Sequence, residues 1–352
     1  MTDELAAYDY ELPDELIARQ PAARREDARL MIVDRQAETV KHRFVGDLPE
    51  LLGSGDCLVL NDTRVVPARL LGKRAATGGR WEGLFLELTQ DGDWRILSQC
   101  RGKLQAWERI EVYPAHQPDS ADRLVLQLVE REEDGIWRAR PTPPVDVWPA
   151  LDKFGTVPLP PYIRRGLAGQ DDFARYQTVY ARHRGSVAAP TAGLHFTPEL
   201  LTRCTERGIA HAFVTLHVGI GTFRPICVDR LEAHHMHSEW CDVGIETIRQ
   251  LALAVERGSR RIAVGTTTAR ALESAAQRGR LEAWRGATDL FIRPPFEFRA
   301  MDGLLTNFHL PRSTLLVLVC TFAGRDLIMR AYSEAIRQNY RFYSYGDAML
   351  IV

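Results

Sequence analysis

The chain has 352 residues, enough to bury a substantial core and to form two domains or one domain with an insertion. Its residues are 45% hydrophobic and 26% charged, as is usual for a soluble globular protein, and its formal net charge of −1 excludes a uniformly basic nucleic-acid coat. Six scattered cysteines without a CxxC pair argue against a zinc ribbon or a disulfide framework. The N-terminus lacks the pattern of a signal peptide, and the longest apolar stretch, Leu315–Ala323, is too short to span a bilayer, so we expect a cytoplasmic protein.

The N-terminal part of the chain predicts two buried strands. Leu30–Val33 and Cys57–Leu60 are short apolar runs, and the second leads directly into Asn61-Asp62-Thr63-Arg64. Polar side chains at the end of a strand often contact a ligand in α/β proteins. An Asx turn followed by an arginine explains the same residues equally well.

The pattern changes between Ala68 and about Arg140, where short apolar runs are separated by turn-forming glycine, proline and acidic residues. Several short strands without helical periodicity predict a small β-barrel or sandwich. Pro141–Pro144 marks the end of this region. We therefore predict a mixed-sheet α/β body, formed by residues 1–67 and 151–352, into which residues 68–150 are inserted as a small all-β barrel.

Two later segments combine arginines with aromatic residues. Val157–Arg165 is stiff and extended, and Asp172–His183 is predicted as a helix. Cations that meet phosphates and rings that stack on unpaired bases are suited to RNA, although a solvated face above core tyrosines explains the same pattern. The C-terminal run Tyr340–Tyr345 leaves the same two alternatives. The candidate RNA-binding residues are Arg164, Arg165, Arg175, Tyr176, Arg184 and Arg341.

Residues 184–197 place isolated polar side chains among small residues. Gly185 and Gly193 permit close approaches that a β-carbon forbids, and Thr191 and His195 stand near them. This run predicts a rigid floor on which a ligand lies. A tightly packed connection between two strands is the alternative.

A histidine-rich segment follows the strand predicted over Ala212–Val218, which carries His217 and ends in Gly219–Pro225. Imidazole, carboxylate and thiolate are common ligands of zinc or iron. No second compact cluster completes such a site, so we predict no metal and favour acid/base or hydrogen-bonding histidines. The side chains concerned are His234, His235, His237, Glu239 and Cys241.

The strand predicted over Arg261–Val264 turns through Gly265-Thr266-Thr267-Thr268 into a helix that carries Arg270. Free N–H groups at a helix start form an anion site, although ordinary capping by a threonine explains the same residues. Neither GxxxxGK[ST] nor GxGxxG is present, so a P-loop NTPase and a common dinucleotide fold are not supported. Thr306–His309 places further polar groups at another predicted strand end.

These motifs together resemble the S-adenosylmethionine:tRNA ribosyltransferase-isomerases, a family of bacterial queuosine biosynthesis enzymes, nearly from end to end. Two departures concern local loop shape: Ile220 stands where a small residue is expected, and Pro295 where glycine is expected. The motifs that carry the resemblance are Asn61–Leu70, Tyr176–Ala181, Gly185–Phe196, Leu216–Gly219, Met236–Glu239, Val264–Thr267, Thr306–Pro311 and Tyr340–Asp347.

The resemblance implies an α/β body with a β-barrel insertion and a specific reaction. The ribosyl part of S-adenosylmethionine is transferred and isomerised onto 7-aminomethyl-7-deazaguanine at the wobble position of tRNA, giving epoxyqueuosine-tRNA, adenine and methionine. S-adenosylmethionine is consumed as a substrate, and no metal or other cofactor is implied. We expect a monomer whose partners are tRNA and S-adenosylmethionine.

This chemistry defines what the side chains must do. A base must remove a C5′ proton that the sulfonium acidifies, an acid must protonate the departing adenine, and the substrate amine must lose a proton before it attacks. We predict that His195, His217, His237 and Glu239 carry out these transfers, without assigning individual roles. The predicted S-adenosylmethionine contacts are Arg270, Gly265, Thr266 and Thr267 for the methionine carboxylate, Asp62, Asn307 and His309 for the ribose or base, and Arg64 and Thr191 nearby.

Two other functions are compatible with parts of the sequence. An S-adenosylmethionine-dependent RNA methyltransferase is disfavoured because no glycine-rich loop with a ribose-binding acid follows a first strand. A non-catalytic RNA-binding module is disfavoured by the neutral net charge and by the polar clusters at several predicted strand ends.

Overall fold

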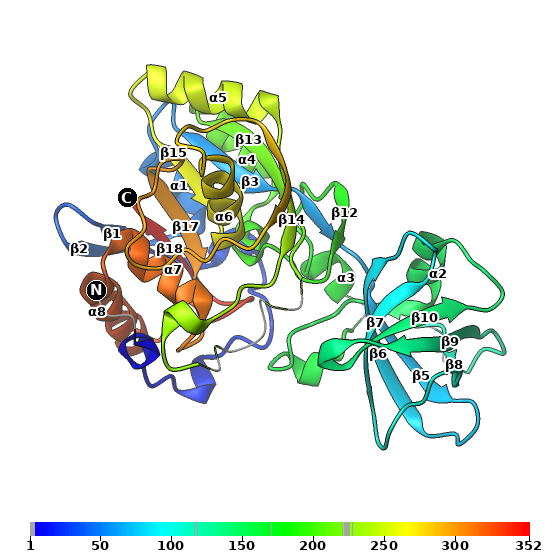
Figure 1. The fold of residues 1–352 in the computed structure, drawn as a ribbon. Helices are drawn as coiled ribbons and strands as arrows, with labels where there is room; N and C mark the ends of the chain where they lie inside the picture. The colour runs from blue at the N-terminus through cyan, green and yellow to red at the C-terminus, as the bar shows by residue number, and fades with distance from the viewer. Residues whose placement is uncertain are drawn as a thin grey trace. The chain divides into compact units, whose positions relative to one another are not determined.

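The structure is a computed structural model that describes residues 4–115, 117, 119–169, 171–219, 221, 226 and 228–352. The chain divides into two compact units, Met1–Arg64 with Arg175–Val352 and Val65–Ala174 (Figure 1). We call the first unit the body and the second the barrel unit. Of the loop Gly219–Pro225, only Gly219 and Gly221 are described, so the expectation about Ile220 lies outside the described residues.

The body is built on a nine-stranded mixed sheet with the order β16-β14-β13-β3-β15-β17-β18-β1-β2. β13, β3, β15 and β17 are parallel to one another, whereas β14, β16, β18 and β2 each introduce an antiparallel pairing. The strands are β1 (Arg29–Asp34), β2 (Thr39–Phe44), β3 (Cys57–Asn61), β13 (Ala210–Leu216), β14 (Glu239–Val243), β15 (Arg261–Val264), β16 (Trp284–Thr288), β17 (Gly303–Asn307) and β18 (Ala348–Ile351).

The central strands consist mostly of apolar residues, because helices and loops bury both of their faces. β3, β17 and β18 are buried at every position, and Leu58, Leu60 and Leu305 join one hydrophobic cluster. α4, α5 and α6 pack against β13, while α7 packs against α8. The helices of the body are α1 (Leu48–Leu51), α4 (Pro198–Glu206), α5 (Ile245–Glu256), α6 (Thr266–Ala275), α7 (Thr314–Ala323) and α8 (Arg325–Arg337).

The barrel unit confirms the predicted all-β insertion as a closed six-stranded antiparallel barrel. The strand order β5-β6-β7-β10-β9-β8 closes through a pairing of β5 with β8, and β11 adds an edge to β5. Closure brings Gly72 so near β8 that a Cβ atom would lie 2.4 Å from the Glu111 carbonyl oxygen, so only glycine fits there. The strands are β5 (Arg69–Arg74), β6 (Arg80–Leu88), β7 (Trp94–Cys100), β8 (Arg109–Val112), β9 (Leu124–Arg131), β10 (Ile136–Pro141) and β11 (Gly155–Thr156).

Alternate side chains of the barrel strands point inward and form its core. Trp81 and Phe85 on β6, Trp94 and Ile96 on β7, and Leu126 on β9 are all buried. The alternation follows from the period of two in a β-strand, and each fully buried aliphatic or aromatic side chain contributes about 1.5–3 kcal/mol. Residues after β10 add α2 (Val147–Phe154) and the first three residues of α3 (Asp172–Arg175), whose last residue belongs to the body.

The helix predicted over Asp172–His183 is wrong beyond its first turn. α3 ends at Arg175, and the chain then turns so that the backbone N–H groups of Arg182 and His183 donate to the Asp62 carbonyl. These contacts lead into a short strand, β12 (His183–Ser186), which pairs with β4 (Thr63–Val65). Tertiary hydrogen bonds therefore override the local helical pattern.

Among the described residues, no helix combines the length and the apolar character that crossing a membrane requires.

The topology gathers several chain segments at one edge of the body sheet. β3 is flanked by β13 on one side and β15 on the other, so the strand order reverses at β3, and such a switch point is where open α/β sheets bind ligands. The carboxyl ends of β13, β3, β15 and β17 lie at this edge, which we call the carboxyl edge. The registers Asn307 with Ala348 and Leu30 with Ala348 bring the starts of β18 and β1 to the same edge.

Candidate active site

The loop formed by residues 184–197 is both tightly packed and part of the carboxyl edge. Ser186 accepts a hydrogen bond from the Val218 N–H at 2.8 Å and donates to the Ala188 carbonyl at 2.7 Å, which ties the loop to the end of β13. A Cβ on Gly193 would lie 2.2 Å from the Tyr180 hydroxyl oxygen, so the chain passes there only because glycine has no side chain. The loop then forms a 3-10 helix over Thr191–His195 and leads into α4, which Thr197 caps.

His195, at the end of that 3-10 helix, is buried and uncharged at neutral pH. Burial lowers its pKa to about 4, and the nearby Arg341 guanidinium also disfavours the protonated ring. The Asn307 amide favours the charged ring but makes no well-aligned bond to it. His195 Nε2 and Asn307 Oδ1 both lack a hydrogen-bond partner within the described parts of the chain. A buried, unprotonated nitrogen without a partner is suited to accept a proton or a hydrogen bond from a ligand.

His217 follows the last residue of β13 and is held on three sides. Its Nδ1 lies 2.7 Å from the Thr63 hydroxyl, and its ring stacks on Trp240 with centroids 5.1 Å apart. A Cβ on Gly185 would lie 2.7 Å from the imidazole, so that glycine makes room for the ring. Burial lowers the pKa of His217 to about 4, with a further contribution from His183. His217 is therefore a second neutral imidazole at the carboxyl edge.

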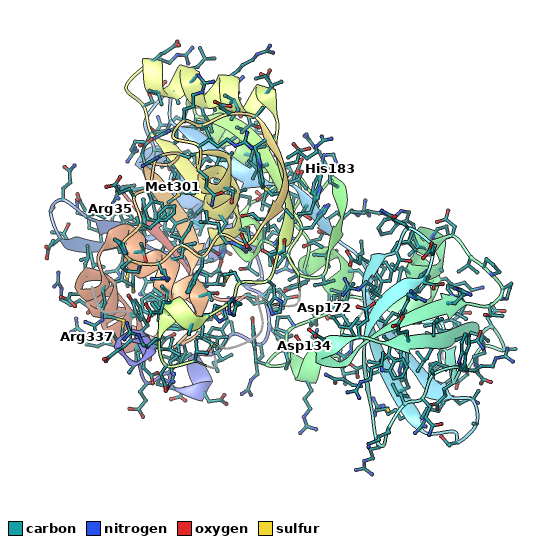
Figure 2. The ribbon with its side chains drawn as sticks, in the orientation of Figure 1. Arg35, Asp134, Asp172, His183, Met301 and Arg337 are labelled. Atoms are coloured by element: carbon teal, nitrogen blue, oxygen red, sulfur yellow. The ribbon has the colours of Figure 1, made fainter. Side chains whose placement is uncertain are left out.

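Asp62 and His183 form a pair that the sequence did not predict. Asp62 is buried and accepts a hydrogen bond from the Thr215 hydroxyl at 2.7 Å, while His183 Nε2 lies 3.6 Å from the other carboxylate oxygen. Burial raises the pKa of Asp62. The His183 side chain is 62% exposed and lies at the surface of the body (Figure 2). No motif singled out His183, because it lay within a segment predicted to be helical.

The turn at Gly265 lies beside the end of β3. Gly265 has φ +95° and its N–H donates to the Leu305 carbonyl at 2.7 Å, so a residue with a side chain would be strained there. The Asn61 amide donates to the Thr267 hydroxyl at 3.2 Å and to the Leu216 carbonyl at 3.1 Å, which ties the ends of β3 and β13 to the start of α6. α6 begins at Thr266, and its first N–H groups and dipole face the carboxyl edge.

Arg270 is engaged by the protein itself. Its guanidinium pairs with Glu239 on β14 and donates to the carbonyls of Leu290 at 3.1 Å and Thr288 at 3.4 Å. The other Glu239 oxygen accepts the Gly219 N–H at 2.8 Å. Both side chains are buried, with exposed fractions of 6% and 3%. Glu273, three residues after Arg270 on the same helix, does not pair with it and instead accepts the N–H groups of Arg299 and Ala300.

The remaining predicted contacts are dispersed. His309 is buried with Nε2 2.8 Å from the Thr306 hydroxyl, and burial lowers its pKa to about 3. His237 and Arg64 are exposed, and Thr191 is partly exposed. Among the residues that the structure describes, no group of three or more His, Cys, Asp or Glu side chains is arranged to hold a metal ion.

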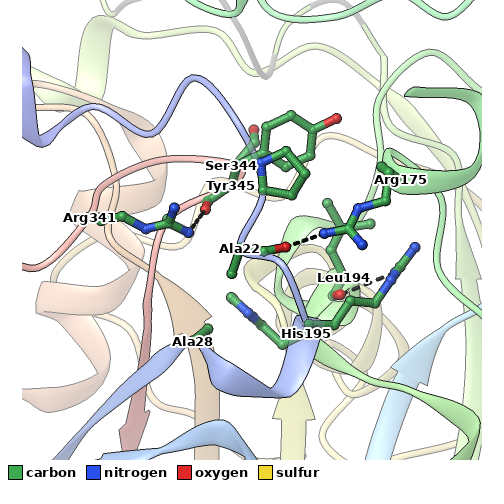
Figure 3. Close-up of a pocket in the computed structure, with 11 residues that line it drawn as sticks. Ala22, Ala28, Arg175, Leu194, His195, Arg341, Ser344 and Tyr345 are labelled. Atoms are coloured by element: carbon green, nitrogen blue, oxygen red, sulfur yellow. Dashed lines mark hydrogen bonds between the residues drawn. The ribbon is translucent and has the colours of Figure 1, made fainter. Parts of the chain in front are cut away.

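The predicted RNA-binding residues divide between the two units. Arg164 and Arg165 belong to the barrel unit, where Arg164 pairs with Asp172 and donates to the Leu167 carbonyl. Arg175 and Arg341 belong to the body and line one pocket together with His195 (Figure 3). In the body, Arg184 is exposed, whereas Tyr176 is only 1% exposed and packs edge-on against Tyr345.

Comparison with known proteins gives a full-length match. A family model described as "Queuosine biosynthesis protein" matches residues 5–351. The S-adenosylmethionine:tRNA ribosyltransferase-isomerase of Thermosynechococcus vestitus is 47% identical over 350 residues, 99% of this chain and 96% of that protein. The protein of the same name from Thermotoga maritima is 46% identical over 349 residues, 99% of this chain and 100% of that protein.

A solved structure agrees with these sequence matches. The crystal structure of an S-adenosylmethionine tRNA ribosyltransferase from Thermotoga maritima has a TM-score of 0.56 and 38% identity, covering 98% of this chain and 100% of that one. The fold and the matches define an enzyme of the queuosine biosynthesis class. Within that class, the chain belongs to the family of S-adenosylmethionine:tRNA ribosyltransferase-isomerases, which confirms the resemblance seen in the sequence.

Proposed function

We propose that the chain transfers and isomerises the ribosyl part of S-adenosylmethionine onto 7-aminomethyl-7-deazaguanine at the wobble position of tRNA. The products are epoxyqueuosine-tRNA, adenine and methionine. The observation that carries the proposal is the full-length family match, which extends through every motif at the carboxyl edge. The inserted barrel and the switch point at β3 support it independently, because they provide the expected architecture.

The two neutral histidines of the carboxyl edge are suited to the proton transfers. His195 and His217 both have a pKa lowered to about 4, so near pH 7 each ring is uncharged and offers a nitrogen that can accept a proton. A base removes the C5′ proton next to the sulfonium, and the same or another group later donates a proton to the departing adenine. Asp62 with His183 is a second candidate for an acid/base pair, because a buried carboxylate orients and stabilises a protonated imidazole.

The two charged residues proposed for catalysis and carboxylate binding act together. Glu239 and Arg270 form a closed pair that fixes the Gly219 amide. We therefore propose that they position the loop after β13, and that the Gly265–Thr267 turn receives the methionine carboxylate through its N–H groups and hydroxyls. Asn307, with a buried amide oxygen that has no partner within the described chain, is the proposed contact for a ribose or base donor.

The substrates also indicate where the protein acts. tRNA and S-adenosylmethionine are both present in the cytoplasm, and we propose that the chain acts there as a monomer. Light scattering of the free protein tests the monomeric state, and a dimer mass would refute it.

One incubation separates the proposed function from its alternatives. Protein, S-adenosylmethionine and tRNA carrying the aminomethyl base are mixed, and the small-molecule products are identified. The proposed reaction releases adenine and methionine in equal amounts. A methyltransferase releases S-adenosylhomocysteine instead, and an RNA-binding module releases nothing. His195→Ala is expected to abolish adenine release while the protein stays folded, whereas unchanged turnover would make His195 a core residue only.

A further inference from the structure

Three arginines from distant parts of the chain converge on one pocket at the carboxyl edge. Arg25 precedes β1, Arg175 is the last residue of α3, and Arg341 precedes β18. All three line the pocket that has His195 in its wall (Figure 3). Ser344 and Tyr345 complete the polar part of the lining, and the rest is apolar or backbone. The sequence did not single out Arg25, since only the fold brings it to this place.

Each of these arginines donates side-chain hydrogen bonds to backbone carbonyls. Arg25 donates to the carbonyls of Gln177 at 2.9 Å and Leu194 at 3.1 Å, and Arg341 donates to the Tyr345 carbonyl at 2.7 Å. Arg175 donates to the carbonyls of Ala22 and Ala23. Carbonyls hold a guanidinium in place but carry no net charge. The pocket is therefore preorganised and positively charged.

Two of the three guanidinium groups have no carboxylate partner among the described residues. Arg175 and Arg341 make no ion pair with a described residue, and the pocket lining contains no acidic side chain. Asp347 lies near enough to interact electrostatically with Arg341, but its two oxygens accept the backbone N–H groups of Arg29 and Arg341 at 2.9 and 2.8 Å. Burial and the neighbouring Arg175 also lower the pKa of Arg25, as expected where like charges are held close together.

We propose that this pocket binds a single phosphodiester group of the tRNA substrate and thereby places the target nucleotide beside His195. The inference rests on the proposed function and adds to it a defined contact. A phosphodiester is an anion without a counter-charge of its own, and guanidinium groups bind phosphate oxygens through two N–H donors at a time. The methionine end of S-adenosylmethionine fits less well, because its carboxylate is accompanied by an ammonium and a sulfonium, and the lining offers no acidic side chain to receive either.

The test measures binding of an anticodon stem-loop RNA that carries the aminomethyl base, without turnover. Arg25→Gln, Arg175→Gln and Arg341→Gln are each expected to weaken binding about tenfold or more, the effect of losing a hydrogen bond to a charged group. Arg24→Gln is the matched control, because Arg24 is adjacent in sequence, 68% exposed and paired with Glu26 outside the pocket. It is expected to change affinity about twofold or less.

The same RNA is then prepared with one neutral methylphosphonate linkage at each position around the wobble nucleotide. At one position, the neutral linkage is expected to weaken binding to the wild type about tenfold and to remove the difference between wild type and the three variants. The alternative outcome is that, with each methylphosphonate linkage, the three variants still bind the RNA more weakly than wild type by the same factor. The arginines would then form a diffuse positive face, and the single phosphate site would be refuted. Equal RNA affinity of Arg175→Gln and wild type would also refute it.

Two further measurements keep the outcomes distinct. S-adenosylmethionine affinity is expected to be unchanged in Arg175→Gln; a loss of that affinity with intact RNA binding would assign the pocket to the methionine carboxylate and overturn the proposal. Thermal unfolding of each variant identifies any that fail to fold, and Arg341→Lys, which keeps the charge but loses the planar fork, is expected to restore part of the RNA affinity. If the wild type binds the RNA but releases no adenine, the proposed function fails while this inference stands.

Discussion

Removing Arg270 is expected to destabilise the body by several kcal/mol. Its partner Glu239 would stay buried and keep the Gly219 N–H bond but lose its counter-charge, and breaking a buried ion pair in this way costs about 3–5 kcal/mol. At about 2.1 cal/mol/K of unfolding entropy per residue, a chain of 352 residues loses about 1.4 °C of melting temperature per kcal/mol, so Arg270→Ala is expected to melt roughly 4–7 °C below wild type. Thermal and denaturant unfolding of the purified variant measure the loss.

A second ion pair, which also has its carboxylate on β14, provides the control. Arg285 on β16 pairs with Asp242 on β14, but the Arg285 side chain is 71% exposed, so Arg285→Ala is expected to cost about 1 kcal/mol or less. The double variant Arg270→Met/Glu239→Gln leaves no buried charge and is expected to recover part of the loss. Suppose instead that Arg270→Ala is as mild as Arg285→Ala and weakens S-adenosylmethionine binding more than tenfold. Arg270 would then bind the methionine carboxylate, and the structural account of the pair would be wrong.

Two other perturbations test the histidines. Gly185→Ala places a methyl group against the His217 ring and is expected to lower adenine release about 10- to 100-fold, whereas Gly244→Ala, where nothing lies within 4 Å, leaves it unchanged; equal activities would show that the ring position does not matter. The pKa of His309 is lowered to about 3 in the folded protein, whereas in the unfolded chain it is about 6.5. On acidification the unfolded chain therefore takes up this proton first, so the contribution of His309 to stability is complete at pH 7 and is lost as the pH falls. Between pH 6.5 and 4.5 the free energy of unfolding of wild type is expected to fall about 2–3 kcal/mol more than that of His309→Gln, and parallel pH curves would contradict the burial effect.

Local patterns in the sequence were sufficient to predict much of the fold and of the carboxyl edge. Apolar runs that end in polar residues located β3, β15 and β17, and the topology brings Asp62, Gly265 and Asn307 together because the carboxyl ends of parallel strands meet. The barrel was predictable because turn residues recur at short intervals between alternating strands. These features depend on the residues immediately adjacent in the chain.

The contacts that the sequence did not predict join residues that are far apart in the chain. The partner of Arg270 is Glu239 rather than the nearby Glu273, because the side chain reaches across to β14. Arg25 was one of several arginines in an irregular segment, and only the pairing of β1 with β18 brings it beside Arg341. His183 was hidden in a predicted helix that the Asp62 carbonyl redirects into a strand. Ion pairs and contacts between residues that are far apart in the chain cannot be predicted from the spacing of residues in the sequence.

The fate of the ribose tests the central claim most directly. S-adenosylmethionine labelled with ¹³C in its ribose is incubated with the protein and tRNA carrying the aminomethyl base, and the nucleosides of the digested tRNA are analysed by mass spectrometry. The account predicts that all five labelled carbons appear on the modified base as epoxyqueuosine, with one adenine released for each. Unlabelled tRNA, or a product that carries only a methyl group from S-adenosylmethionine, would contradict it.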